Sequence, residues 1–292
     1  MIEPVYNICC IGHITRDKVV NPGSVVNMPG GTAWYFSQAI ARMPVNYGLV
    51  TAVGNDELIY ADQLRHLNVD VTTLPCAHTV CFENSYGDNP DHREQRVLQK
   101  ADSFTVAQLS GIHAKLFHLG PLLADDFEDG VIQHLAARSM VSLDVQGLLR
   151  SVEDTRVVPA HWPAKNKLLP YIHTLKVNEH ELAVLTAQQD ITTGAKILAG
   201  MGVKEVVITL GSEGSLIYAD SVCHTIAACK PGIFKDATGC GDTYMAGYLY
   251  KRIQGASIPE AGHFASAMAG LKAGISGPFN GTEEEVNNFA PA

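Results

Sequence analysis

Short apolar runs alternate with longer helical patterns along most of the chain. Six runs that end at glycine or polar residues are typical of buried strands, and they cover residues 5–11, 47–53, 116–119, 140–145, 174–177 and 206–210. Five segments between them carry apolar residues at helical spacing: 33–42, 57–67, 125–137, 179–186 and 193–201. Strands that alternate with helices predict a mostly parallel sheet with helices on both faces. We therefore expect one α/β domain over residues 1–292.

Two parts of the chain depart from this rhythm. Residues 215–218 and 222–227 predict short antiparallel strands, and the helices that follow are expected at 242–253 and 259–273. Between 71 and 98 there is little helical period: residues 79–86 alternate, a turn-rich stretch follows at 87–91, and residues 93–98 come after it. We interpret 71–98 as a β-hairpin lid subdomain, to which short strands near 12–30 could contribute. An ordinary surface hairpin is the alternative.

Composition excludes several classes of protein. Of 292 residues, 46% are apolar and 17% charged, which is enough to build a core, and the net charge is −9. An acidic chain is unsuited to non-specific binding of nucleic acid or anionic membranes. The seven cysteines form no CxxC pair, so neither a disulfide framework nor a zinc ribbon is indicated. No apolar run approaches the roughly 20 residues of a membrane-spanning helix, and the first residues lack a basic stretch. We expect a cytoplasmic protein with no membrane or nucleic-acid partner.

The most informative segment lies at residues 236–247, where a Gly-x-Gly turn stands at the expected start of a helix. Gly239 and Gly241 allow close approach to the backbone, and the first amides of a helix have no partners within it. Such amides suit a phosphoryl group that is gaining negative charge. Asp242 could accept the proton of an attacking hydroxyl, or it could be a structural cap. Cys240 could be a nucleophile at the helix N-terminus, although its small size between two glycines explains it more simply.

Two further segments follow predicted strands. Asn178 and Glu181 are three residues apart at the start of a helix, so they could hold water ligands of magnesium or phosphate oxygens. A capping box fits the same spacing. Thr209, Gly211 and Gly214 follow the strand near residue 206 and could cradle nucleotide phosphates, or could simply form a turn. No Walker A motif and no Rossmann G-x-G-x-x-G are present.

Near the N-terminus, Asp17 follows the strand that Gly12 ends. Gly30 and Gly31 then lead into the helix expected from residue 33. A carboxylate beside a di-glycine backbone could hold several hydroxyls of a polyol, although an isolated Asp17 would more often be a turn residue. There is no HExxH or G-x-S-x-G motif, so neither a zinc protease nor a serine hydrolase is supported.

Taken in this order, the segments resemble the ribokinase-like pfkB family of carbohydrate and nucleoside kinases. The matching positions are Gly12 with Asp17, Pro29-Gly30-Gly31, Asn178-x-x-Glu181, Thr209-x-Gly211-x-x-Gly214 and Asp236-x-Thr238-Gly239-x-Gly241-Asp242. The resemblance implies a Rossmann-like three-layer αβα sandwich with a small β-sheet lid. It also implies that ATP and Mg²⁺ serve as cofactors.

Carried over by position, the resemblance gives each motif a role. Asp242 would be the catalytic base, and the backbone of Gly239, Cys240 and Gly241 the anion hole. The residues implied to place magnesium and the nucleotide phosphates are Asn178, Glu181, Thr209, Gly211 and Gly214, with Glu181 acting on magnesium through water. Those implied to hold substrate hydroxyls are Asp17, Gly30 and Gly31. Asp236 and Thr238 match positions that help to build a monovalent-cation site in many members, so K⁺ is a further candidate cofactor.

This sequence departs from the family pattern at two positions. Cys240 stands where alanine is usual, and Tyr35 stands where many sugar kinases have asparagine, which argues against a ribose- or fructose-type contact pattern. Residues 96–100 and 144–150 are similar to the myo-inositol kinase branch, in which Arg150 would contact substrate. The expected function is ATP-dependent phosphorylation of a small sugar, polyol or cyclitol, with a myo-inositol-like acceptor slightly preferred and a nucleoside as the alternative.

Two other function classes stay open on the sequence. One is a non-catalytic sensor of the same fold that binds nucleotide or sugar; the presence of Asp242, Asn178 and Glu181 disfavours it. The other is a dinucleotide-dependent oxidoreductase, which the missing glycine fingerprint disfavours.

A lid with exposed edges and one apolar face could also pair across a two-fold axis as a homodimer.

Overall fold

A nine-stranded sheet forms the centre of the computed structural model, which describes residues 5–86 and 93–290. The strand order is β15-β14-β13-β12-β9-β8-β1-β4-β5. All pairs from β13 to β5 are parallel, whereas β14 and β15 are antiparallel. The strands are β1 (Tyr6–Ile11), β4 (Tyr47–Val53), β5 (Asp70–Pro75), β8 (Ala114–Leu119), β9 (Met140–Asp144), β12 (Thr174–Asn178), β13 (Glu205–Thr209), β14 (Ser215–Ala219) and β15 (Val222–Ile226). Every strand that the apolar runs predict is present, with ends shifted by at most two residues.

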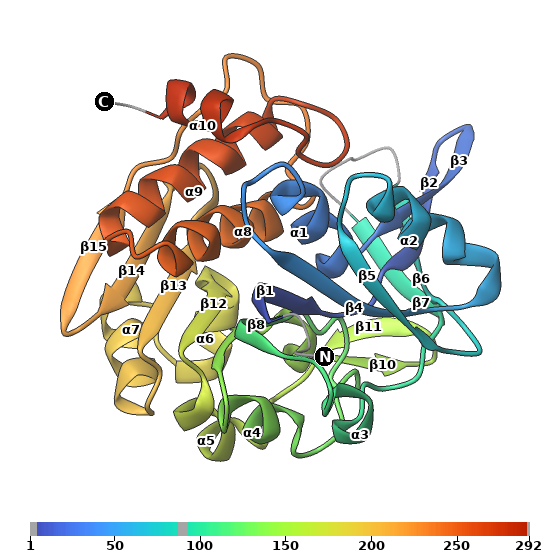
Figure 1. Cartoon of the computed structure of the whole chain (residues 1–292), viewed down its shortest axis with the longest axis horizontal. Coiled ribbons are helices and arrows are strands. Elements are labelled where there is room, and N and C mark those ends of the chain that lie inside the picture. Colours follow the sequence, from blue (N-terminus) through green and yellow to red (C-terminus); the bar gives the residue numbers. More distant parts are fainter. Residues whose placement is uncertain (1–4, 87–92, 291–292) are drawn as a thin grey trace.

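Helices cover both faces of this sheet, so the body has three layers (Figure 1). One face is covered by α1 (Thr32–Ile40), α2 (Leu58–Arg65), α8 (Cys240–Ile253), α9 (Ile258–Ala273) and α10 (Glu283–Phe289). The other is covered by α3 (Val106–Leu109), α4 (Val131–Ala136), α5 (Lys165–Leu168), α6 (Glu179–Thr186) and α7 (Ile191–Gly200). The expected Rossmann-like αβα sandwich is confirmed.

The central strands are apolar on both sides because both sides are covered. In β1, Ile8 and Cys10 join the core beneath α1 and α8, while Cys9 and Ile11 join the core beneath α4 and α6. Strands buried on both faces have near-continuous apolar sequences rather than alternating ones. This explains why the runs are easy to recognise in the sequence.

A second, six-stranded sheet packs beside the carboxyl end of the main sheet, in the order β10-β11-β7-β6-β2-β3. Its strands are β2 (Thr15–Asn21), β3 (Ser24–Gly30), β6 (Val80–Tyr86), β7 (Arg93–Gln99), β10 (Arg150–Glu153) and β11 (Arg156–Pro159). The lid therefore differs from the expected segment 71–98. Strand β5 at its start belongs to the main sheet, and the hairpin β10–β11, which the sequence analysis missed, extends the lid. The turn expected at 87–91 lies outside the described residues.

The apolar face of the lid is covered by the chain itself. Val80, Phe82 and Val97 pack against Leu122 and Leu123 of the body. The opposite face carries ion pairs, in which Lys18 Nζ lies 2.7 Å from Glu83 Oε2 and Arg96 lies 3.9 Å from Glu83. At these residues the apolar lid face, which was expected to seek cover in a dimer, is covered by the body of the same chain. Edge strand β3 still exposes Val25 and Val26, and pairing of two chains through the lid stays a prediction.

Some helices differ from the expectation. The helix predicted at 125–137 shortens to α4, because Asp126 instead accepts the amides of Leu122 and Leu123 and Phe127 bridges to Phe104. Helices α3 and α10 were not predicted, although each begins with a Thr-x-x-Gln/Glu capping box that signals a helix start. None of the helices in the described part of the chain is long and apolar enough to cross a membrane.

Candidate active site

The turn before α8 is the segment that was predicted to form an anion hole. Gly239 caps the helix in the left-handed region at φ 75°, and a Cβ there would lie 2.3 Å from Tyr35 Cδ1. Only glycine fits both conditions. Tyr35 therefore closes the back of the turn instead of contacting substrate as an asparagine would. The Cys240 amide, one of the predicted donors, donates to Ala237 O at 3.1 Å within the turn. The amides of Gly241 and the residue after it are then the first ones the helix leaves for an anion.

Asp242 lies half-buried in the first turn of α8. Burial raises the pKa of its carboxyl to about 6, and the neighbouring Asp144 carboxylate adds to the rise. The charge of Lys176 lowers this pKa. A hydrogen bond with the Thr32 side chain and the charge of Arg150 also lower it. A carboxyl with such a pKa is ionised at neutral pH and yet basic enough to accept a proton from a reacting hydroxyl.

A buried lysine that the sequence analysis missed lies beside the same turn. Lys176 Nζ, on β12, is 3.0 Å from Asp144 Oδ2, and both side chains are less than a tenth exposed. A Cβ built on Gly241 would lie 3.5 Å from Lys176 Nζ, so the ammonium lies beside the turn of the expected anion hole. Burial alone lowers the pKa of Lys176, but the carboxylates of Asp144, Glu181 and Asp242 outweigh burial and raise it. The lysine is therefore cationic.

Asn178 and Glu181 form the capping box that the sequence analysis held as the alternative. Asn178 Oδ1 accepts the Glu181 amide at 2.9 Å, and Glu181 Oε2 accepts the Asn178 amide at 2.7 Å. The box also places the Glu181 carboxylate near Lys176 and Arg150. Burial raises the pKa of Glu181, and the charge of Lys176 lowers it. In residues 5–86 and 93–290 no three His, Cys, Asp or Glu side chains come together as metal ligands. A magnesium ion here would depend on phosphate oxygens and water, with Glu181 able to bind one such water.

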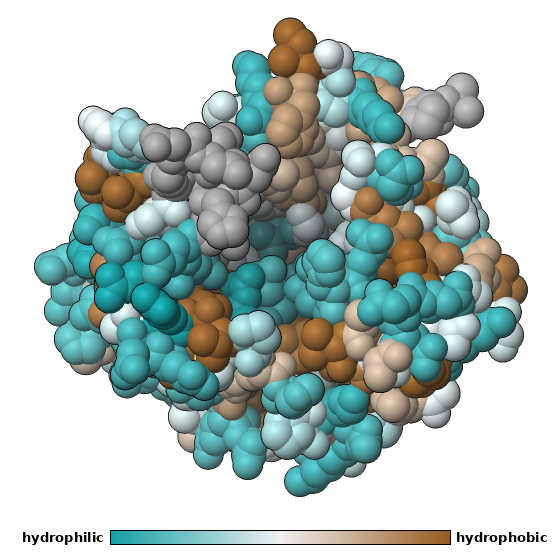
Figure 2. All heavy atoms as spheres, turned by 180° about the vertical axis from the view of Figure 1, so that it is seen from behind, coloured by the Kyte–Doolittle hydropathy of each residue, from teal (hydrophilic) through white to brown (hydrophobic). Residues whose placement is uncertain are grey.

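A pocket of about 570 Å³ opens next to the anion hole. The predicted phosphate-binding residues Thr209, Gly211 and Gly214 line it together with Cys240 and Gly241. Its outer wall is the loop between β15 and α8, with Ala269 and Ala273 of α9 opposite. The surface is hollowed near the centre of this side of the molecule (Figure 2). The expected phosphate-binding segment at 209–214 and the anion-hole turn therefore share one pocket, whereas Asn178 and Glu181, the other residues expected at the nucleotide, do not line it.

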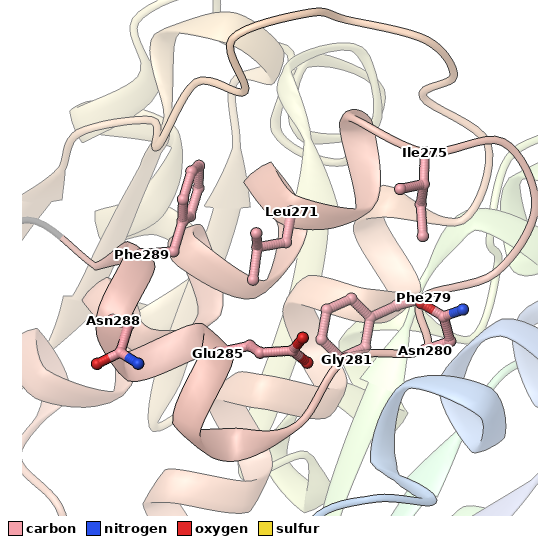
Figure 3. Close-up of a pocket in the computed structure, with 8 residues that line it drawn as sticks. All are labelled: Leu271, Ile275, Phe279, Asn280, Gly281, Glu285, Asn288 and Phe289. Atoms are coloured by element: carbon pink, nitrogen blue, oxygen red, sulfur yellow. The ribbon is translucent and has the colours of Figure 1, made fainter.

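A second hollow of about 670 Å³ lies between the end of α9 and α10. Leu271, Phe279 and Glu285 point into it (Figure 3). It is lined by none of the predicted site residues, and we assign no role to it.

On the lid side, the predicted substrate residues come together. A Cβ on Gly30 would lie 2.4 Å from Asp17 Oδ2, and Thr15 Oγ1 donates to Asp17 Oδ1 at 2.6 Å. Gly31 caps α1 at φ 85°, a conformation that favours glycine. Strand register puts Asp17 opposite Phe82, on the lid face that packs against the body.

Two more residues of the lid sheet belong to the candidate site. Asn84 is buried, accepts Gln95 Nε2 at 2.9 Å, and shares the lid face of Phe82 because the two are two residues apart in β6. The alternation over residues 79–86 could have identified it. Arg150, at the start of β10, interacts electrostatically with Asp242 and Glu181. The structure thus brings Arg150 within electrostatic reach of Asp242, the residue expected to be the base.

The monovalent-cation site expected at Asp236 and Thr238 needs correction. Lys272 Nζ lies 3.2 Å from Asp236 Oδ2 and 3.0 Å from Asp236 O, and it is completely buried. Thr238 donates its amide to Asp236 Oδ1 at 2.8 Å. The oxygens of Asp236 are thus bonded to the protein's own donors, and they do not offer an open cation site.

Comparison with known proteins shows the family of the chain. A model of the pfkB family carbohydrate kinases matches residues 4–285. The chain is 37% identical to a nucleoside kinase of Methanothermobacter thermautotrophicus, over 90% of this chain and 88% of that protein. It is 24% identical to an inositol 3-kinase of Arabidopsis thaliana, over 88% of this chain and 71% of that protein.

Solved structures of ribokinase-family kinases are similar to this chain along nearly its whole length. A pyrophosphate-dependent kinase in the ribokinase family, complexed with a pyrophosphate analog and myo-inositol, has a TM-score of 0.85 at 27% identity, covering 96% of this chain and 99% of that one. The ribokinase of Arabidopsis thaliana has a TM-score of 0.79 at 19% identity, covering 98% of this chain and 99% of that one. This similarity shows the same fold. The chain therefore belongs to the pfkB family of carbohydrate kinases, as a ribokinase-like phosphotransferase that acts on a sugar or nucleoside hydroxyl.

Proposed function

We propose that the chain transfers the γ-phosphoryl group of ATP to a hydroxyl of a small polyhydroxy acceptor, a cyclitol of the myo-inositol type being the first candidate. One observation carries the proposal. Asp242 stands in the first turn of α8, and the Lys176 ammonium interacts electrostatically with its carboxylate and lies beside Gly241 of the same turn. A base, hydrogen-bond donors and a fixed cation are what phosphoryl transfer to an alcohol requires from a protein.

In the proposed mechanism the acceptor hydroxyl lies between the lid and Asp242. Asp242 takes the hydroxyl proton as the oxygen attacks the γ-phosphorus, and the amides at Gly241 with Lys176 stabilise the charge on the transferred group. Thr32 orients the carboxylate through its hydrogen bond. Magnesium, when bound, neutralises phosphate charge. Closure of the lid would exclude water that would otherwise hydrolyse ATP.

The acceptor side favours a compact, neutral polyol. Asp17 and Asn84 present polar atoms on one lid face, and Arg150, at the start of lid strand β10, interacts electrostatically with Asp242. Several hydroxyls of a ring alcohol could each find a donor or acceptor there. One aromatic ring on this face, that of Phe82, is buried against Leu122 and Leu123, so this ring is not presented for stacking on a nucleobase.

A nucleoside acceptor is the second candidate. It is favoured by the 37% identity to a nucleoside kinase.

A donor-and-acceptor screen tests the proposed function. Purified protein is given ATP and magnesium, and ADP release is measured against inositols, sugars, linear polyols and nucleosides, with pyrophosphate as an alternative donor. We expect ADP release with one polyhydroxy class. With pyrophosphate as donor the readout is phosphorylated acceptor, and we expect none. Binding of ATP without ADP release across the whole panel would favour the sensor alternative and overturn the proposal.

Phe234 offers a test of the donor. Its side chain is 66% exposed and lines the nucleotide pocket together with Ala237 and Pro231. We expect it to pack on the ATP base, so Phe234→Ala should raise KM for ATP about 2- to 10-fold, the equivalent of one aromatic contact of about 0.5–1.5 kcal/mol, and should leave kcat nearly unchanged. Steady-state kinetics at saturating acceptor measures both.

The neighbouring Ile233 supplies the matched control for Phe234. It is 72% exposed but is not among the residues that line the pocket. Ile233→Ala should therefore leave KM for ATP unchanged. Equal effects of the two substitutions would show that loop disorder, not contact with the base, is responsible.

A further inference from the structure

A buried ammonium group lies directly beneath the anion hole. Lys272, in the last turn of α9, has no exposed surface. Its Nζ lies 3.0 Å from Asp236 O, 3.2 Å from Asp236 Oδ2 and 3.5 Å from Ile275 O. A buried charge is tolerated only where it is paired and hydrogen-bonded, and this lysine has one carboxylate and two carbonyl oxygens around it.

These three oxygens form the kind of shell that binds an alkali cation. Hard cations take carboxylate and backbone carbonyl oxygens as ligands, and K⁺ is held where carbonyl oxygens replace its hydration shell. Here the same type of oxygen set is filled by a cation that the chain supplies itself. The residues do not fit an added K⁺ ion, because its place is taken.

The ammonium is connected to the catalytic turn through a short path. Asp236 shares its two carboxylate oxygens between Lys272 Nζ and the Thr238 amide, which lies 2.8 Å from Oδ1. Thr238 leads directly into Gly239, whose left-handed conformation starts α8. Lys272 thereby fixes the loop that aims the anion-hole amides.

We propose that the Lys272 ammonium replaces a bound monovalent cation beneath the anion hole, so that this chain needs no K⁺ for phosphoryl transfer. The activity part of this proposal rests on the proposed function. The structural part, a tethered cation that orders residues 236–241, does not.

The first test uses the unaltered protein. ADP release is measured with the acceptor found in the screen, at a constant ionic strength of about 0.1 M, with KCl, NaCl, NH₄Cl or tetramethylammonium chloride. We expect equal rates in all four salts. A rate that rises several-fold with K⁺ over tetramethylammonium would overturn the proposal, whatever happens to any variant.

The second test removes the tethered cation. Lys272→Ala leaves the oxygens of Asp236 and Ile275 around a vacated space, and the loop should lose its alignment, which can cost about 10²-fold in rate. We expect K⁺ and NH₄⁺, but not tetramethylammonium, to restore part of the activity. We also expect them to raise the Tm of the variant, a readout that does not depend on the kinase reaction, while the Tm of the unaltered protein does not respond.

The matched control is Lys251→Ala, which removes a lysine whose Nζ lies 2.6 Å from Glu283, on the same side of the sheet. It should show no response to K⁺ in rate or in Tm. If folded Lys272→Ala also shows no such response, or if it keeps full activity in tetramethylammonium, Lys272 does not stand in for a cation. If Lys272→Ala does not fold in any salt, the first test still decides.

Discussion

Replacing Asp242 with asparagine is expected to lower kcat by about 10²- to 10⁴-fold, the usual contribution of a general base, with little change in ATP affinity. Asparagine keeps the shape of the side chain and can still accept the hydrogen bond from Thr32, but it cannot take a proton. The measurement is kcat for ADP release, together with ATP affinity by titration. A well-folded Asp242→Asn variant with near-normal kcat would remove this residue from the mechanism.

The pH dependence adds a second readout for Asp242. Its pKa is raised from 3.8 to about 6, first by burial, and the base must be ionised to act. The rate of the unaltered protein should therefore rise with pH around 6 and level off above it. A flat profile from pH 5 upward would mean that the reactive carboxyl has an ordinary pKa.

The same shift makes Asp242 costly for stability at neutral pH. Because the pKa is higher in the folded than in the unfolded chain, the folded protein binds the proton more tightly. The stability contributed by this group is fully present below about pH 4 and is lost as pH rises through about 6. Asp242→Asn should thus have a higher Tm than the unaltered protein at pH 7.5.

Asp190 provides the control for that measurement. It caps α7 by accepting the Thr193 amide, and its pKa is lowered, chiefly by hydrogen bonds from Thr193. Its contribution has the opposite sign, since it is present at neutral pH and lost as pH falls. Asp190→Asn keeps a good capping residue and should change neither kcat nor the pH profile.

Patterns that depend on local burial could be predicted from the sequence, whereas contacts between distant segments could not. The parallel strands were recognisable because each is apolar on both sides. The small sheet was predicted only in part, because β10 and β11 are short, half-buried strands that join it from a segment 50 residues downstream of β7. No local pattern reveals such a pairing.

In the candidate site, too, residues that stand together in the sequence were predicted and residues that meet only in the fold were missed. Asp242 and its glycines were identified because they stand together in one turn. Lys176 and Lys272 were missed because each acts on a residue far away in the sequence, Asp144 or Asp236. A signal was present for Lys176, as a charged residue between the fully buried Leu175 and Val177 has to be paired inside the protein.

Lys176 is the missed residue whose loss should have the largest effect on both stability and activity. In Lys176→Met the Asp144 carboxylate stays buried without its ammonium partner, which should lower the free energy of unfolding by about 3–5 kcal/mol. Loss of the cation beside Gly241 should also lower kcat by about 10²- to 10³-fold, as removal of a single oxyanion donor does. Denaturant unfolding and steady-state kinetics measure the two effects.

A double variant separates the structural role of Lys176 from its role toward the phosphate. Replacing the pair together, as Asp144→Leu with Lys176→Met, removes both buried charges, and such replacements are often neutral or stabilising. The double variant should therefore regain most of the lost stability. Its kcat should stay low, because no cation faces the anion hole. Recovery of kcat along with stability would instead mean that Lys176 only neutralises Asp144, and that the amides of α8 carry the phosphoryl charge without it.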